Sequence, residues 1–271
     1  MNFYRFEQLK ADLLTPNLST AEGSVIEGRY IYFCSVFKET GTGSEPHYHP
    51  NELLIFPLKG KINAVVGKDN RIVEPGTFIH VPAYALHSMK ATEDGPLTYL
   101  YIKDQTWSVV GVAADEETPE KALSVKEVND LYEKGKIEDR KNTGVNKTSK
   151  SAAIIEGLNN SYYPILDKLD APATSAQRTI RIEGERMVFE FFELPKGYDD
   201  LQYTSVHEKF IYLLTGYLDV VINGNKKTME MGDVVHIEKG ATVKIGSEND
   251  ELVRYVAAES QPFLEERIDE E

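Results

Sequence analysis

Between Gly23 and Ile102 the chain alternates short apolar runs with residues that favour turns. Each run has about five to eight residues, is rich in aromatic and β-branched side chains, and ends at Gly, Pro, Asn or Asp. This pattern is typical of β-strands joined by tight turns. The stretch to Ile102 is long enough to supply the strands of one β-barrel.

The pattern returns in the second half of the chain at one constant interval. Gly28 corresponds to Gly184, Gly60 to Gly216 and Gly76 to Gly232. Core positions follow the same interval: Leu58 and Leu214, Val65 and Val221, His80 and His236, Tyr99 and Tyr255. Turn glycines and core positions that match at one interval indicate a duplicated unit. The sequence therefore predicts an all-β protein of two tandem barrels.

The predicted domains are an N-terminal barrel at 1–104, a helical and polar linker at 105–172, and a C-terminal barrel at 173–271. In the linker, Ser124 and Glu127 form a capping box that predicts a helix of about ten residues ending near Gly135. The polar segment 140–151 is rich in Lys, Asn, Thr and Ser and is the best candidate for a mobile connection.

Three of the six histidines lie in the first barrel at spacings that suit a metal ion. His47 and His49 are two residues apart, so on a strand both imidazoles point to the same face. His87 follows after strands short enough to fold it back beside them. Neutral imidazole is the commonest metal ligand among side chains, and three ligands leave positions open for chemistry.

The sequence resembles the cupin superfamily at these residues. The spacing of His47 and His49, the turn Pro75-Gly76, and then Pro82 and His87 is similar to the two-part cupin signature. The resemblance implies jelly-roll barrels with one divalent metal in the mouth of the first, held by the three histidines.

One position departs from the pattern of most metal-binding cupins, which have a glutamate where this chain has Leu53. Glu52 is the neighbouring residue and is a candidate fourth ligand, although a shift of one residue turns a side chain to the other face of a strand unless a bulge intervenes. The alternative is that Glu52 orients an imidazole or has a structural role, since Glu208 stands at the equivalent place of the second barrel.

Without the glutamate, the site resembles that of three-histidine, ring-cleaving dioxygenases of the gentisate type, which implies Fe(II), with Mn, Ni, Co or Zn as alternatives. That resemblance is loose, because the tryptophan-rich segment around their third histidine is absent here.

Four further residues are candidates to line the pocket: Phe78, His80, Tyr84 and Met89. For each, packing in the core or at the rim is the alternative. The second barrel carries Tyr203, Ser205 and Val243 at the places of the three histidines and Lys209 at that of Leu53. It is therefore predicted to keep the fold and to lack the metal.

Charge and composition exclude several classes of protein. A net charge of −14 argues against nucleic acid and anionic membrane surfaces as partners. No apolar stretch is long enough to span a membrane and no signal-peptide core is visible, so a cytoplasmic location is predicted. The single cysteine, Cys34, lies in an apolar run and is interpreted as packed and inert.

The resulting hypothesis is a metal-dependent enzyme acting on a small organic molecule, with an Fe(II) dioxygenase as the leading form. The alternatives are a non-redox isomerase, cyclase or lyase, and a non-catalytic protein that binds a small ligand. Two-barrel cupins often pair, so the resemblance also implies a homodimer.

Overall fold

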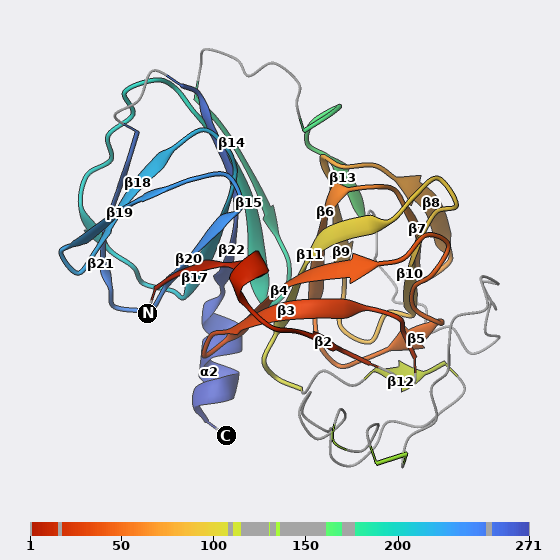
Figure 1. The fold of residues 1–271 in the computed structure, drawn as a ribbon. Helices are drawn as coiled ribbons and strands as arrows, with labels where there is room; N and C mark the ends of the chain where they lie inside the picture. Colours follow the sequence, from red (N-terminus) through yellow and green to blue (C-terminus); the bar gives the residue numbers. More distant parts are fainter. Residues whose placement is uncertain are drawn as a thin grey trace. The chain divides into compact units, whose positions relative to one another are not determined.

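A computed structural model describes most of the chain (Figure 1). The described residues are 2–15, 18–107, 111–114, 130, 134–135, 161–169, 177–247 and 251–270. The helix predicted after Ser124 lies outside the described residues except for Asp130, Lys134 and Gly135, and the polar segment 140–151 lies wholly outside them.

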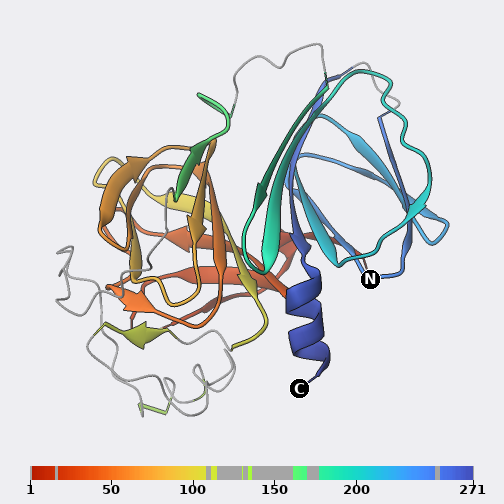
Figure 2. The ribbon, with the colours of Figure 1, turned by 180° about the vertical axis from the view of Figure 1, so that it is seen from behind.

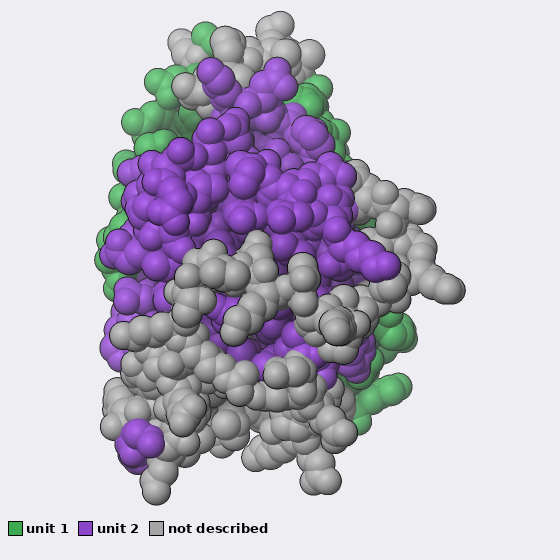
Figure 3. Space-filling model, turned by 90° about the vertical axis from the view of Figure 1, so that its right-hand side faces the viewer, with its two compact units in different colours: residues 1–9, 26–33, 170–271 green, residues 10–25, 34–169 purple. Residues whose placement is uncertain are grey.

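The chain forms two compact units, which Figure 3 distinguishes by colour. One unit consists of Met1–Leu9, Ile26–Phe33 and Asp170–Glu271, and the other of Lys10–Val25 and Cys34–Leu169. The units differ from the predicted domains at the N-terminus, and the predicted boundaries stay a prediction.

The first barrel is made of two antiparallel sheets, visible on opposite sides of it in Figures 1 and 2. One sheet has seven strands in the order β13-β9-β6-β11-β4-β3-β2, and the other has five in the order β12-β5-β10-β7-β8. The strands of the larger sheet are β2 (Ala11–Leu13), β3 (Glu22–Glu27), β4 (Ile31–Lys38), β6 (Leu53–Lys59), β9 (Thr77–Val81), β11 (Leu97–Asp104) and β13 (Tyr162–Pro164). Those of the smaller sheet are β5 (His47–Tyr48), β7 (Ile62–Val66), β8 (Asp69–Val73), β10 (His87–Ala91) and β12 (Val112–Ala113).

The second barrel repeats this plan with a six-stranded sheet, β1-β20-β17-β22-β15-β14, and a four-stranded sheet, β16-β21-β18-β19. The strands of the larger sheet are β1 (Phe3–Arg5), β14 (Arg178–Glu183), β15 (Met187–Leu194), β17 (Lys209–Thr215), β20 (Asp233–Ile237) and β22 (Val253–Ser260). Those of the smaller sheet are β16 (Tyr203–Thr204), β18 (Leu218–Ile222), β19 (Asn225–Met229) and β21 (Thr242–Gly246). A 3-10 turn, η1 (Phe6–Gln8), follows β1, and one helix, α2 (Pro262–Asp269), follows β22. The predicted all-β fold with two tandem jelly-roll barrels is confirmed.

Burial explains why these segments form strands. In β18 the residues alternate between buried and half-buried, and Leu218, Val220 and Ile222 all belong to the core of the second barrel. Strand β7 at the equivalent place in the first barrel shows the same alternation. A period of two is what a strand with one face on the core requires.

The turn glycines support the duplication as well. Gly60 and Gly216 both have φ +80°, in the left-handed region that favours glycine. A Cβ atom on Gly60 would also collide with the carbonyl oxygen of Pro96. The repeat seen in the sequence therefore reflects equivalent turns in the two barrels.

The start of the chain joins the second barrel, which the sequence did not indicate. Strand β1 pairs with β20, with Phe3 opposite Val235. The Phe3 side chain packs against the core of that barrel. A strand of three residues carries no signal for its partner, so this pairing could not be predicted.

Candidate metal centre

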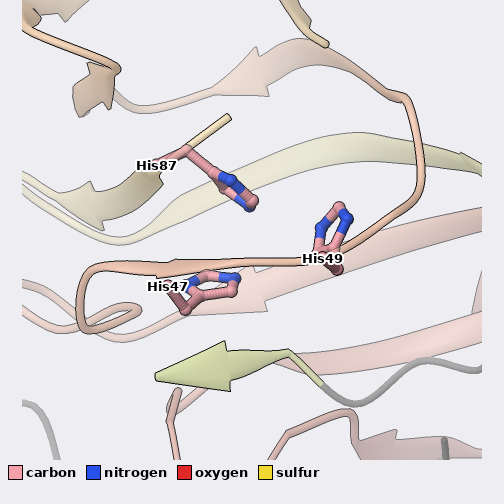
Figure 4. Close-up of side chains that lie close together, drawn as sticks. All are labelled: His47, His49 and His87. Carbon is pink, nitrogen blue, oxygen red and sulfur yellow. The ribbon is translucent and has the colours of Figure 1, made fainter. Parts of the chain in front are cut away.

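The smaller sheet of the first barrel brings the three predicted histidines together. Strand β10 runs antiparallel to β5 with His87 directly opposite His47, and His49 follows two residues later. The ring centroids of His47 and His87 are 4.3 Å apart, and those of His49 and His87 are 4.8 Å apart. Figure 4 shows the three rings turned toward one shared space.

Backbone carbonyl groups hold all three rings in one tautomer. The Nδ1 atom of His47 lies 2.7 Å from the oxygen of Glu45, that of His49 lies 3.2 Å from the oxygen of Asn51, and that of His87 lies 2.8 Å from the oxygen of Ala85. A carbonyl oxygen only accepts, so each Nδ1 must carry the proton and donate it. Each Nε2 then has a free lone pair, which is the arrangement found in metal-ligating histidines.

The free Nε2 atoms have no partner within the described part of the chain. Those of His49 and His87 are buried and make no hydrogen bond there. Potential ligand atoms of the three residues lie within 4.8 Å of one another. Leaving buried acceptors unsatisfied is unfavourable, and a divalent ion bound to all three nitrogen atoms would satisfy them. The residues therefore fit a metal ion.

Burial also keeps the three imidazoles in the form that binds metal. It lowers the pKa of His47 to about 4, and it lowers the pKa of His49 and of His87 well below the usual value of a histidine. The positive charge that His47 would carry adds to this effect at His49 and His87, and that of His87 adds to it at His49. At neutral pH all three are therefore uncharged, and only the neutral ring has a lone pair to give.

These shifts predict that the metal-free protein loses stability in acid. A histidine with a pKa of 6.5 in the unfolded chain and about 4 in the folded protein binds more protons when unfolded between these values. Stability should therefore be constant above about pH 6.5 and fall as the pH drops toward 4, by on the order of 3 kcal/mol for His47 alone. Urea titrations of metal-free protein at pH 7.5, 6 and 5 measure this, and unchanged stability over the range would contradict it.

The three histidines open onto a small cavity of about 30 Å³, which is enough for one or two water molecules. Of the four predicted pocket residues, Met89 lines this cavity, and Leu53 lines it too. Lys38, Tyr99 and Tyr101 complete much of the wall, and sequence reasoning missed all three. Burial raises the pKa of both tyrosines, so their hydroxyl groups stay protonated and can donate hydrogen bonds.

Glu52, the candidate fourth ligand, is not part of the group of converging ligand atoms. Its carboxylate lies 2.7 Å from the Nε2 atom of His80. Leu53 points into the cavity, and neighbouring residues of an extended segment point to opposite sides. In the second barrel Glu208 and His236 form the same pair at 2.9 Å, so both pairs belong to the repeated architecture.

The remaining pocket candidates, which were expected at the wall, lie away from the cavity. His80 is bound to Glu52, and Phe78 is fully buried and packs against Tyr163. Tyr84 is 48% exposed and has φ +63°. None of the three is among the residues that surround the cavity.

The second barrel has an ion-pair network around Lys209, which stands at the place of Leu53. The Lys209 Nζ atom lies 2.9 Å from a carboxylate oxygen of Glu190 and 2.7 Å from one of Glu259. Within the described ranges, no other group of histidine, cysteine or acidic residues has the geometry of the first-barrel cluster. A charged side chain, neutralised by two carboxylates, therefore stands where the first barrel has Leu53.

Comparisons with known proteins agree with this architecture. Residues 36–103 match the family described as Cupin domain, and residues 165–261 match the family described as Ethanolamine utilisation protein EutQ. No curated protein sequence matches the chain.

Solved structures of oxalate decarboxylase match over both barrels. One, determined for its substrate binding mode, is 15% identical with a TM-score of 0.65. A second, of the Bacillus subtilis enzyme studied for its Mn(II) centres, is 14% identical with a TM-score of 0.65. Each covers 96% of this chain and 77% of the other. At this identity the likeness establishes the fold alone. The chain is a two-barrel protein of the cupin superfamily.

Among the described residues, no helix combines the length and apolar character needed to cross a membrane.

Proposed function

We propose that the protein is a metal-dependent enzyme that acts on a small organic substrate at the three-histidine site of the first barrel. One observation carries the proposal: the Nδ1 atoms are all engaged by backbone carbonyl groups, and buried Nε2 atoms converge without partners among the described residues. A histidine that serves only packing would be expected to satisfy both nitrogen atoms.

The three imidazole ligands limit which metal ions and which reactions the site can support. Three neutral imidazoles hold a divalent ion without reducing its charge, and they leave at least one position open. A divalent ion bound there would act as a Lewis acid on a substrate oxygen. Fe(II) is the ion implied by the sequence resemblance, and Mn(II) is equally compatible, since a structure with the same fold has Mn(II) centres. Zn, Co and Ni remain alternatives.

The chain's own residues supply a small, partly open site. Leu14, Leu53 and Met89 form apolar parts of the wall, while Tyr99 and Tyr101 line the cavity with hydroxyl groups that stay protonated and can donate to a substrate oxygen. The volume of about 30 Å³ favours a substrate of a few heavy atoms, unless the walls move to admit a larger one. Size therefore argues for small acids, aldehydes or ketones before aromatic rings.

An oxygen-dependent reaction, including the predicted dioxygenase, is the second candidate. The observation in its favour is that an apolar side chain, Leu53, lines the cavity where most metal-binding cupins have a glutamate. The comparisons do not support this choice over non-redox chemistry. The homodimer and the cytoplasmic location also stay predictions.

The test is reconstitution of metal-free protein with Fe(II), Mn(II), Zn(II), Co(II) or Ni(II) under argon. Each form is then incubated with small carboxylic, hydroxy and keto acids, and with aldehydes and diketones, in argon and in air. Substrate loss is followed by NMR and oxygen by electrode. Turnover in argon would support non-redox chemistry, and turnover with matching oxygen uptake would support the dioxygenase. Metal binding without turnover of any compound would leave a binding protein instead.

A further inference from the structure

Lys38 places a buried amino group on the wall of the metal-site cavity, and burial lowers its pKa to about 7. It is the last residue of β4, and its side chain is 2% exposed. Its Nζ atom donates a hydrogen bond of 2.6 Å to the backbone oxygen of Met89 and lies 5.4 Å from the centre of the Tyr99 ring. Lys38 therefore lines the same cavity as the three histidines.

No carboxylate neutralises Lys38 within the part of the chain that the structure describes. Its partners there are a carbonyl oxygen and an aromatic ring, and the nearby charge of Lys90 adds to the cost of burial. An ammonium group has three N–H donors, so one hydrogen bond leaves two of them unused. A buried charge without a counter-ion is unfavourable, and a ligand of opposite charge would relieve it.

The other residues of the cavity wall also favour a ligand of negative charge. Among the described residues, no aspartate or glutamate lines the cavity, although the chain as a whole has a net charge of −14. A divalent ion on three neutral imidazoles would add two further positive charges. The cavity is thus cationic inside an acidic protein, which favours a small anion over a neutral molecule.

We propose that Lys38 is a specificity-determining residue that selects substrates carrying a negatively charged oxygen, such as a carboxylate or an enolate. This inference rests on the proposed metal-dependent function. One oxygen of the substrate takes the open side of the three-histidine site, and the negative charge is neutralised by the Lys38 ammonium group. Pairing with the substrate is what keeps Lys38 charged in its buried position.

Lys90 offers a matched control. It is 3% exposed, and its Nζ atom has no hydrogen-bond partner among the described residues. It follows Met89 on β10, so its side chain leaves the opposite face of that strand, and it does not line the cavity. Lys90→Gln and Lys38→Gln remove the same charge from equally buried positions.

The experiment compares Mn(II)-loaded wild type, Lys38→Gln and Lys90→Gln. Acetate and acetamide serve as probes because they have nearly the same shape and differ in charge. Binding is measured by calorimetry and by the loss of water-proton relaxation at the Mn(II) ion. We expect Lys38→Gln to weaken acetate binding by about tenfold or more, with acetamide affected less than about twofold. Lys90→Gln should bind acetamide like the wild type, and acetate as tightly as the wild type or more tightly, because it removes a charge that opposes that of Lys38.

Metal affinity gives a second readout. The Lys38 ammonium group repels a divalent cation, so Lys38→Gln should bind Mn(II) as tightly as the wild type or more tightly. A merely structural role would weaken metal binding instead. Lys38→Arg, which keeps the charge, should retain more acetate affinity than Lys38→Gln.

Each result bears on one claim. If Lys38→Gln binds Mn(II) and acetate like the wild type, or if Lys90→Gln loses as much acetate affinity, the role of Lys38 is wrong while the metal site stands. The same holds if the Mn(II)-loaded wild type has no preference for acetate over acetamide. If the wild type binds no divalent metal, the proposed function itself fails. Near-ultraviolet circular dichroism shows whether Lys38→Gln folds. If it does not fold, Lys38→Arg is used instead: an acetate affinity as low as the acetamide affinity overturns the proposal, and a retained preference for acetate over acetamide supports it.

Discussion

Protein carrying both His47→Ala and His49→Ala is expected to lose its divalent metal, from about one ion per chain to background. Two of the three ligand nitrogen atoms disappear, and His87 alone cannot hold an ion against water. The backbone carbonyl groups of Glu45 and Asn51 lose only a donor each. Elemental analysis by mass spectrometry, on protein purified without a histidine tag, measures the metal directly, and any activity found with the wild type should fall to the uncatalysed rate.

The control for this experiment is His207→Gln in the second barrel. The His207 Nδ1 atom lies 3.0 Å from a carboxylate oxygen of Glu265, and glutamine can still donate there. This variant should keep its metal and activity. If the double variant is folded and still holds an ion at wild-type stoichiometry, the site lies elsewhere in the chain and the assignment of His47, His49 and His87 is wrong.

The sequence allowed the repeated fold and the histidine cluster to be predicted because both depend on short-range rules. Alternation along strands gave His47 and His49 a common face, and turn residues such as Gly60 and Gly76 fixed where the chain reverses. The register that sets His87 opposite His47 follows from these turns. The equal φ angles of Gly60 and Gly216 show that the two barrels have the same turn at this position.

The cavity wall could not be predicted, because it depends on which strands face one another across a barrel. Lys38 is the last residue of β4 and Tyr99 lies on β11, and both strands belong to the larger sheet. Both side chains nevertheless line the cavity next to the three histidines, two of which lie on strands of the smaller sheet. Nothing in the local pattern around Lys38 distinguishes it from a solvated lysine at a strand end. Tyr84 was proposed because it lies near His87 in the sequence, and His80 because alternation from Phe78 puts it on the face of Pro82. Neither local argument says which side chains meet across a barrel.

The Glu52 question shows the value of the internal repeat. Glu52 with His80 and Glu208 with His236 form the same pair in a barrel with the histidine cluster and in one without it. A pair that also occurs in a barrel whose described residues form no such cluster must serve the fold. The equivalence of Glu52 and Glu208 was visible in the sequence, whereas the direction of the side chain needed the structure.

The second large effect is expected at Glu208, whose carboxylate organises a turn of the unit that contains the second barrel. It accepts backbone N–H groups from Arg29 at 2.7 Å and from Tyr30 and Ile31 at 2.8 Å, and it is 1% exposed. Glu208→Ala would leave these three donors, two of them buried, without this partner, and it would also remove the side-chain partner of His236. We expect the free energy of unfolding to fall by about 4 kcal/mol, which lowers the melting temperature by roughly 10 °C.

Calorimetry of three variants separates this role from a general effect of losing a carboxylate. Glu238→Ala removes an exposed carboxylate from the same barrel and should change the melting temperature by less than about 2 °C. Gly28→Ala keeps the Glu208 carboxylate but displaces it, because the new Cβ atom would lie 2.5 Å from the Oε1 atom of Glu208. This variant should therefore also lower the melting temperature. Gly28 does not have a positive φ, so the effect would be steric. If Glu208→Ala has the same melting temperature as the wild type, the three N–H groups must find other partners, and the carboxylate does not stabilise this turn.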